Sequence, residues 1–186
     1  AMERHFYADD SQFYLRFKLK DTESNVKKVC LCSADIKKWM AQNELKLNDG
    51  KTELIVFSSK HSVSKLPNIA VSVGECEILP SDCVRNLGSY FDQTMSMIPH
   101  ISNLCRTAFH TFRLAGRVRK YITSDAAHSL LRGLLLSRLD YCNSLLIGVP
   151  AKYIRRLQLL QNNAARIISR AKCRDHVTPL LRELHW

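Results

Sequence analysis

The chain has 186 residues, 46% hydrophobic and 24% charged, which are ordinary proportions for one or two globular domains. Its seven cysteines are an odd number without the spacing of a disulfide framework, and no apolar run approaches the roughly 18 residues that cross a membrane. The first residues are polar and charged, unlike a signal peptide. We therefore expect an intracellular protein, nuclear and/or cytoplasmic, with reduced thiols and no membrane partner.

The formal net charge of +11 is unevenly distributed. Residues 1–92 contain as many acidic as basic residues, so the whole positive excess lies in residues 93–186. Such asymmetry predicts a nucleic-acid partner for the second half, because neutralising phosphates releases counterions and supplies affinity. A basic domain that is merely soluble is the alternative.

Residues 2–18 predict a β-hairpin, because two aromatic-rich, partly alternating segments flank the pair Asp9-Asp10. Aspartate is favoured in turns. Two adjacent carboxylates on a turn supply the oxygen ligands that Mg²⁺ takes at polymerase sites, although such pairs also occur in ordinary hairpins.

The rest of the first half predicts a helix followed by strands. The helical spacing of Val26, Val29, Ile36, Trp39 and Met40 indicates a helix over residues 25–43 with these side chains inward. The strands are expected at residues 52–57, at 69–73 and 76–79 around a two-residue turn Gly74-Glu75, and at 83–91 with an interruption at Gly88. This order predicts an antiparallel sheet with a helix on one face.

After Asp92 the hydrophobic period is helical throughout. Helices are expected at residues 97–121, 125–146, 151–171 and 178–185, with Phe109, Leu134 and Ile154 among the inward side chains. The change of composition predicts two domains, residues 1–92 and 93–186, and an α+β fold in which an all-helical bundle follows the sheet.

Basic side chains form stripes on the helices of the second half. Arginine suits bidentate phosphate contacts, and such contacts are sequence-independent and salt-sensitive. The phosphate-binding candidates are Arg106, Arg113, Arg117, Lys120, Arg155, Arg166 and Arg170.

Several motifs occur in the order found in one polymerase family. Tyr7-Ala8-Asp9-Asp10 between two apolar strands resembles the central motif of reverse transcriptases. Residues 39–53 (WMAQNELKLNDGKTE) and 84–88 (VRNLG) are similar to the next motifs of LINE-type, non-LTR retrotransposon polymerases. Residues 137–146, 161–166 and 184–186 resemble the region beyond the polymerase core in the jockey-like branch.

The resemblance implies the back part of a polymerase palm in residues 1–92 and a thumb in residues 93–186. The implied activity is RNA-directed DNA synthesis from dNTPs on an RNA template and DNA primer, or on the resulting RNA–DNA hybrid, by two-metal nucleotidyl transfer with Mg²⁺ or Mn²⁺. The implied roles are metal binding by Asp9 and Asp10, proximity to the primer end for Tyr7 and Ala8, and a primer-gripping loop at Leu87 and Gly88.

Lys51 follows a turn and starts an expected strand, where a lysine can protonate the leaving pyrophosphate as a general acid. The resemblance supports that role and places Asn48 and Thr52 in the same motif. A solvated Lys51, and a plain bend at Leu87-Gly88, are the structural alternatives.

The resemblance also implies a further metal-binding aspartate, on a strand that precedes the Asp9-Asp10 hairpin in the family, and a fingers region. Neither is found in these 186 residues, so we expect no polymerase activity from this chain by itself. The alternative function is a catalytically inactive nucleic-acid-binding remnant or repurposed module.

Overall fold

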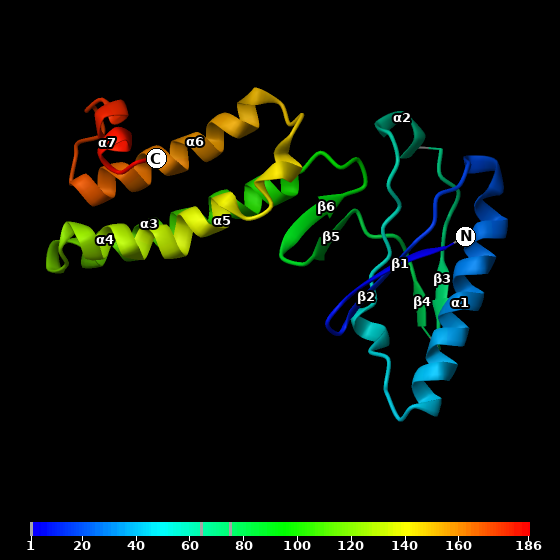
Figure 1. The fold of residues 1–186 in the computed structure, drawn as a ribbon. Coiled ribbons are helices and arrows are strands. Elements are labelled where there is room, and N and C mark those ends of the chain that lie inside the picture. Colours follow the sequence, from blue (N-terminus) through cyan, green and yellow to red (C-terminus); the bar gives the residue numbers. More distant parts are fainter. Residues whose placement is uncertain (1, 64, 75) are drawn as a thin grey trace. The chain divides into compact units, whose positions relative to one another are not determined.

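The computed structural model describes residues 2–63, 65–74 and 76–186. It contains helices and small antiparallel sheets, which confirms the mixed α+β class (Figure 1). Two compact units divide between Val84 and Arg85, inside strand β5 (Cys83–Asn86), whereas the change of composition falls at residue 92. Each unit is described by itself below.

The first unit opens with the expected hairpin of β1 (Glu3–Tyr7) and β2 (Asp10–Tyr14). A 3₁₀ turn (Leu19–Asp21) leads into α1 (Thr22–Gln42), and a second 3₁₀ turn (Asp49–Lys51) precedes the short α2 (Lys60–Val63). A second hairpin, β3 (Val71–Val73) with β4 (Cys76–Ile78), packs its first strand against α1 and buries Val71 and Val73.

Two expectations for the first unit are wrong. Residues 52–57 form no strand, and only one parallel bridge joins Leu54 to Pro80, because no neighbouring strand offers a ladder there. Trp39, expected inward, is 58% exposed, since β3 covers only part of the apolar stripe of α1. The expected turn at Gly74-Glu75 is described only at Gly74, because Glu75 lies outside the described residues.

A polar junction ties α1 to the loop that precedes Lys51. The ammonium of Lys37 forms an ion pair with Asp49 at 2.9 Å. Gly74 lies against the same pair with a φ of +64°, and a Cβ atom there would overlap the end of the Lys37 side chain. The ion pair therefore occupies space that only a glycine at position 74 leaves free.

The second unit begins at Arg85, within β5, which forms a hairpin with β6 (Ser89–Asp92), and it continues with helices. The long helix expected at residues 125–146 is interrupted, because a π-helical segment and a 3₁₀ turn replace parts of it. The helical segments are α3 (Ile98–Val118), a 3₁₀ turn (Arg119–Tyr121), α4 (Ser124–Leu131), the π segment (Arg132–Leu136), α5 (Ser137–Asp140), a 3₁₀ turn (Asn143–Leu146), α6 (Ala151–Ser169) and α7 (Val177–Glu183).

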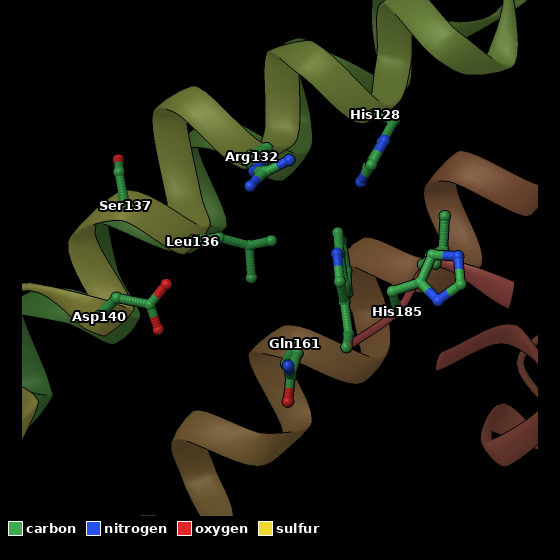
Figure 2. A pocket seen from close by; sticks show the side chains of 9 residues that line it. His128, Arg132, Leu136, Ser137, Asp140, Gln161 and His185 are labelled. Carbon is green, nitrogen blue, oxygen red and sulfur yellow. The ribbon is translucent and has the colours of Figure 1, made fainter. Parts of the chain in front are cut away.

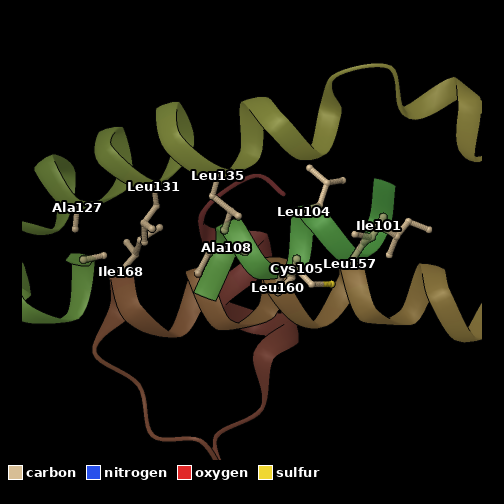
Figure 3. Packing of buried hydrophobic residues seen from close by; sticks show 12 residues of the cluster. Ile101, Leu104, Cys105, Ala108, Ala127, Leu131, Leu135, Leu157, Leu160 and Ile168 are labelled. Atoms are coloured by element: carbon tan, nitrogen blue, oxygen red, sulfur yellow. The ribbon is translucent and has the colours of Figure 1, made fainter. Parts of the chain in front are cut away.

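The core of the second unit lies where α3, α4 and α6 meet (Figure 3). Ile101, Leu131 and Ala164, one from each helix, are fully buried. Three side chains expected inward instead point to solvent, because each lies outside the stripe that its helix buries against its neighbours. They are Phe109, Leu134 and Ile154, with exposed fractions of 56%, 42% and 38%. No helix in the described parts of the chain combines the length and apolarity needed to cross a bilayer.

Candidate functional site

The Asp9-Asp10 pair lies at the tip of the β1–β2 hairpin. Tyr7 and Asp10 are the last paired residues, so Ala8 and Asp9 form a two-residue loop. Ala8 has a φ of 52°, and a positive φ at the first loop residue is the pattern of type II′ turns, whose twist suits a hairpin. A small residue at position 8 therefore keeps the tip narrow beside the two carboxylates.

Both carboxylates face solvent at this tip. Mg²⁺ bound at such sites takes one or two carboxylates, and waters and substrate phosphates complete its octahedral shell. Asp9 and Asp10 fit the oxygen chemistry of that ion and would supply part of its shell. Across the described residues, no group of three or more His, Cys, Asp or Glu side chains is arranged to hold a metal ion.

Aromatic side chains line both faces of the same hairpin. Phe6 and Phe13 pack edge to face with ring centroids 5.9 Å apart, while Tyr7 and Tyr14 are 61% and 53% exposed on the other face, together with Asp10. An aromatic pair of this kind contributes about 0.5–1.5 kcal/mol beyond burial, so it helps a two-stranded ribbon persist.

Lys51 lies in the first unit with the hairpin, at the end of the second 3₁₀ turn. Its side chain is exposed at the end of the 3₁₀ turn, and the hydrogen bonds and ion pairs of the described residues do not join it to Asp9 or Asp10. Nearby, the hydroxyl of Thr52 approaches the carbonyl oxygen of Asn48 at 3.4 Å. The structure thus places Lys51 beside a turn, as expected, with no hydrogen bond or ion pair to the two carboxylates among the described residues.

Leu87 and Gly88 form the turn of the β5–β6 hairpin. Their φ values are +45° and +87°, and two consecutive positive values are the pattern of a type I′ turn. The expected single strand with a bend is therefore wrong, since the chain reverses at these residues. The hydroxyl of Tyr141 donates a 2.7 Å hydrogen bond to the carbonyl oxygen of Leu87 and anchors the turn to the segment after α5.

The loop from β6 to α3 is organised by the carboxylate of Asp92. It accepts hydrogen bonds from the hydroxyls of Thr94 and Ser96 at 2.5 and 3.0 Å and from the backbone N–H of Met97 at 3.1 Å. Burial alone raises the pKa of Asp92, but the hydrogen bonds from Thr94 and Ser96 together outweigh it and hold the pKa below its ordinary value. Asp92 therefore fixes the start of α3.

His100 connects α3 to β6 from the other side of this loop. The residue is 4% exposed, and its Nδ1 faces the backbone N–H of Tyr90 at 3.4 Å. Burial lowers the pKa of His100 because the charged ring would lose its solvation. His100 is consequently neutral and structural, and it accepts the hydrogen bond from Tyr90.

Exposed basic side chains gather on one face of α3. Arg106, Arg113 and Arg117 recur at spacings of seven and four residues, so they share a face, and Lys120 continues it in the 3₁₀ turn that follows. Phe109, three residues after Arg106 and four before Arg113, lies beside this stripe. We call these residues the α3 basic face; they are Arg106, Phe109, Arg113, Arg117 and Lys120.

The other three phosphate-binding candidates are in different environments. Arg155 is exposed on α6. Arg166 donates to the carbonyl oxygen of Asp175 at 3.3 Å, and Arg170 donates to that of Arg119 at 3.1 Å. Arg166 and Arg170 thus each donate a hydrogen bond to a backbone carbonyl of the protein itself.

Arg119 has a structural role that the sequence pattern did not indicate. It is 8% exposed and donates to the carbonyl oxygens of Ile167 and Ile168 at the end of α6. Burial, followed by the positive charge of Arg170, lowers the pKa of Arg119. Its only signal in the sequence was its place between Arg117 and Lys120, off their stripe.

No protein-family model matches the chain, and no curated protein or solved structure is significantly similar to it. The geometry described above is therefore what any functional assignment must rest on, together with the motifs of the sequence.

Proposed function

We propose that the chain carries the C-terminal part of the palm and the thumb of a LINE-type reverse transcriptase, with Asp9 and Asp10 as metal ligands and the second unit as the part that holds the template–primer. The observation that carries this proposal is the position of both carboxylates, exposed at the tip of a narrow two-residue hairpin loop and preceded by Tyr7 and Ala8. The order of the accompanying motifs supports it.

The chemistry expected of Asp9 and Asp10 is to hold Mg²⁺ or Mn²⁺ against the phosphates of the incoming dNTP. These ions stabilise the attacking and leaving oxygens of an in-line displacement. The contribution of this chain is to orient two carboxylates toward solvent on a turn that Ala8 keeps narrow.

Metal binding at the hairpin is testable without polymerase activity. Mn²⁺ added to isotope-labelled protein should broaden the backbone amide resonances of residues 8–11, because a paramagnetic ion relaxes nearby nuclei. Asp9→Asn should abolish the broadening, whereas Asp21→Asn, an acid on a 3₁₀ turn elsewhere in the unit, should leave it intact. Equal broadening in both variants would refute a metal site at this tip.

The second candidate function, a nucleic-acid-binding module without catalysis, is favoured by the α3 basic face alone. Three arginines on one exposed face fit the phosphate backbone, and the adjacent Phe109, 56% exposed, offers a surface on which bases or sugars can pack. This function requires nothing of Asp9, Asp10 or Lys51.

A salt series with a fluorescent RNA–DNA hybrid tests the nucleic-acid partner that both candidates share. Reversing Arg106, Arg113 and Arg117 to glutamate should reduce the slope of log affinity against log salt by about two to three, since each phosphate contact contributes about 0.9. The matched control reverses three exposed lysines of the first unit, Lys18, Lys20 and Lys38. A salt slope that is flat for the unchanged protein would refute a phosphate-binding role.

A further inference from the structure

A pocket of about 500 Å³ lies in the second unit between α6 and the helical stretch formed by α4, the π segment and α5 (Figure 2). His128 of α4, Arg132 and Leu136 of the π segment and Asp140 of α5 line one side. Gln161 of α6 and Trp186 line the other. The volume lies within the range of about 300–1,000 Å³ that small ligands occupy.

The π segment aligns the first side of the pocket. In an uninterrupted α-helix, side chains four residues apart drift by about 40° around the axis. Here the backbone N–H of Ser137 bonds to the carbonyl oxygen of Arg132, five residues earlier, and this wider turn offsets the drift. The hydroxyl of Ser137 also donates a hydrogen bond to the carbonyl oxygen of Gly133 at 2.6 Å, which gives this carbonyl of the π segment a partner.

Three polar groups of the pocket lack partners in the part of the chain that the structure describes. The Nε2 atom of His128 is buried without a hydrogen bond. The guanidinium of Arg132 and the carboxylate of Asp140 form no hydrogen bond or ion pair with another described side chain or backbone group. Arg132 and Asp140 are exposed, so their unpaired charges are open to a ligand that bears both acceptors and donors.

An aromatic wall completes the site. The indole of Trp186 lies 5.6 Å from the imidazole of His128, with 38° between the ring planes. Leu136 adds apolar surface between Arg132 and Asp140. The pocket thus combines a flat aromatic surface, a cation, an anion and an apolar floor.

We propose that this pocket binds one unstacked nucleotide of a single-stranded nucleic acid. Its base packs against Trp186, its phosphate meets Arg132, and Asp140 accepts a hydrogen bond from an amino group on the base. A carboxylate repels the oxygen acceptors of thymine, so bases with an amino group are preferred. The inference rests on the proposed nucleic-acid-binding function.

The indole N–H resonance of Trp186 reports occupancy directly. The chain has two tryptophans, and Trp39→Phe, an exchange at an exposed position, leaves Trp186 as the one indole signal. The probes are deoxycytidine and thymidine 5′-monophosphates and the single-stranded pentanucleotides of each. The cytidine probes should shift the resonance and bind about tenfold more tightly than the thymidine probes.

The titration distinguishes a nucleotide within a strand from a free nucleotide by comparing the pentanucleotide with the monophosphate. A pentanucleotide that binds at least tenfold more tightly than the monophosphate identifies a strand as the ligand. Equal affinities identify a free nucleotide, which would overturn the assignment of a strand. A Trp186 resonance that no probe moves overturns the pocket altogether.

Variants separate the pocket from general charge attraction. Arg132→Gln should weaken binding of the cytidine pentanucleotide about tenfold, and Asp140→Asn should remove the preference for cytosine. Arg138→Gln is the matched control, because Arg138 is an exposed arginine of α5 that does not line the pocket. Equal weakening by Arg132→Gln and Arg138→Gln would overturn the proposal.

Failure of the pocket and failure of the proposed function are distinguishable. The RNA–DNA hybrid is expected on the α3 basic face, none of whose residues lines the pocket. An unmoved Trp186 resonance with retained salt-sensitive hybrid binding refutes the pocket alone. If the unchanged protein does not bind the RNA–DNA hybrid, the proposed nucleic-acid-binding function, on which the assignment of the pocket rests, is refuted.

Discussion

The guanidinium of Arg119 donates a 2.6 Å hydrogen bond from Nη2 to the carbonyl oxygen of Ile168, 49 residues later in the chain. Its Nε and Nη1 atoms donate to the carbonyl oxygens of Ile167 and Ile122, each at 2.9 Å. The last carbonyls of a helix have no partner within the helix, and a cation is favourable at that end. One buried side chain thus holds the end of α6 to the segment between α3 and α4.

Arg119→Lys should lower the free energy of unfolding by about 2–3 kcal/mol, because an ammonium keeps the charge but cannot reach the same carbonyls in a fork. Urea unfolding followed by far-ultraviolet circular dichroism measures the loss. Arg117→Lys, at an exposed position, should change it by less than about 0.5 kcal/mol. Equal effects of the two exchanges would contradict a capping role for Arg119.

Asp92→Asn should destabilise the protein at pH 7 by about 1–3 kcal/mol, because hydrogen bonds to a charged carboxylate are lost. The pKa of Asp92 in the folded state lies below its ordinary value of 3.8. On acidification the unfolded chain therefore takes up the proton first, and this stability disappears as the pH falls through and below 3.8. Urea unfolding from pH 7 to pH 3 should show the two proteins converging, and a constant gap would contradict the interpretation.

His100 should make stability depend on pH in a higher window. Its pKa in the folded state lies below the ordinary value of 6.5, so the neutral ring is the form that the fold prefers. Stability is complete above pH 6.5 and falls as the pH drops below it, because the unfolded chain is protonated first. In His100→Gln this loss between pH 7 and pH 5 should vanish when unfolding is followed at several pH values. A variant with the same pH slope as the unchanged protein would show that His100 is not responsible.

The turn at Leu87 and Gly88 should be sensitive in two separable ways. Gly88→Ala should cost about 1–2 kcal/mol, because a φ of +87° is unfavourable for any residue with a Cβ atom. The added Cβ itself meets only Tyr141, at 3.5 Å, which is an ordinary contact. Tyr141→Phe should cost about 0.5–1.5 kcal/mol through the lost hydrogen bond to Leu87. Thermal unfolding compares them, and no change in either variant would contradict an anchored turn.

Local patterns were sufficient for several elements. The hairpin around Asp9 and Asp10 was predictable because alternating aromatic residues and a short turn act between neighbours in sequence. The N-cap of α4 is a contact of the same local kind, since Thr123 accepts a hydrogen bond from the backbone N–H of Ala126 within one turn. The helical period likewise placed α3 and α6 within a few residues of their observed bounds.

Periodicity was not sufficient to say which side chains a neighbouring helix covers. Phe109 and Leu134 fit the apolar pattern of their helices yet are exposed, because burial depends on where α3, α4 and α6 approach one another. The expected strand at residues 52–57 failed for a related reason, since a strand forms only where a partner offers its backbone groups.

The sequence by itself determined the mixed fold class, the hairpin that carries Asp9 and Asp10, and the positive charge of the second half, because composition and short-range spacing control all three. The tertiary structure alone separated the arginines into exposed ones such as Arg113 and the buried Arg119. It also decided the π segment and the pocket beside it. Those features depend on contacts between segments dozens of residues apart, and no local pattern encodes where such segments meet.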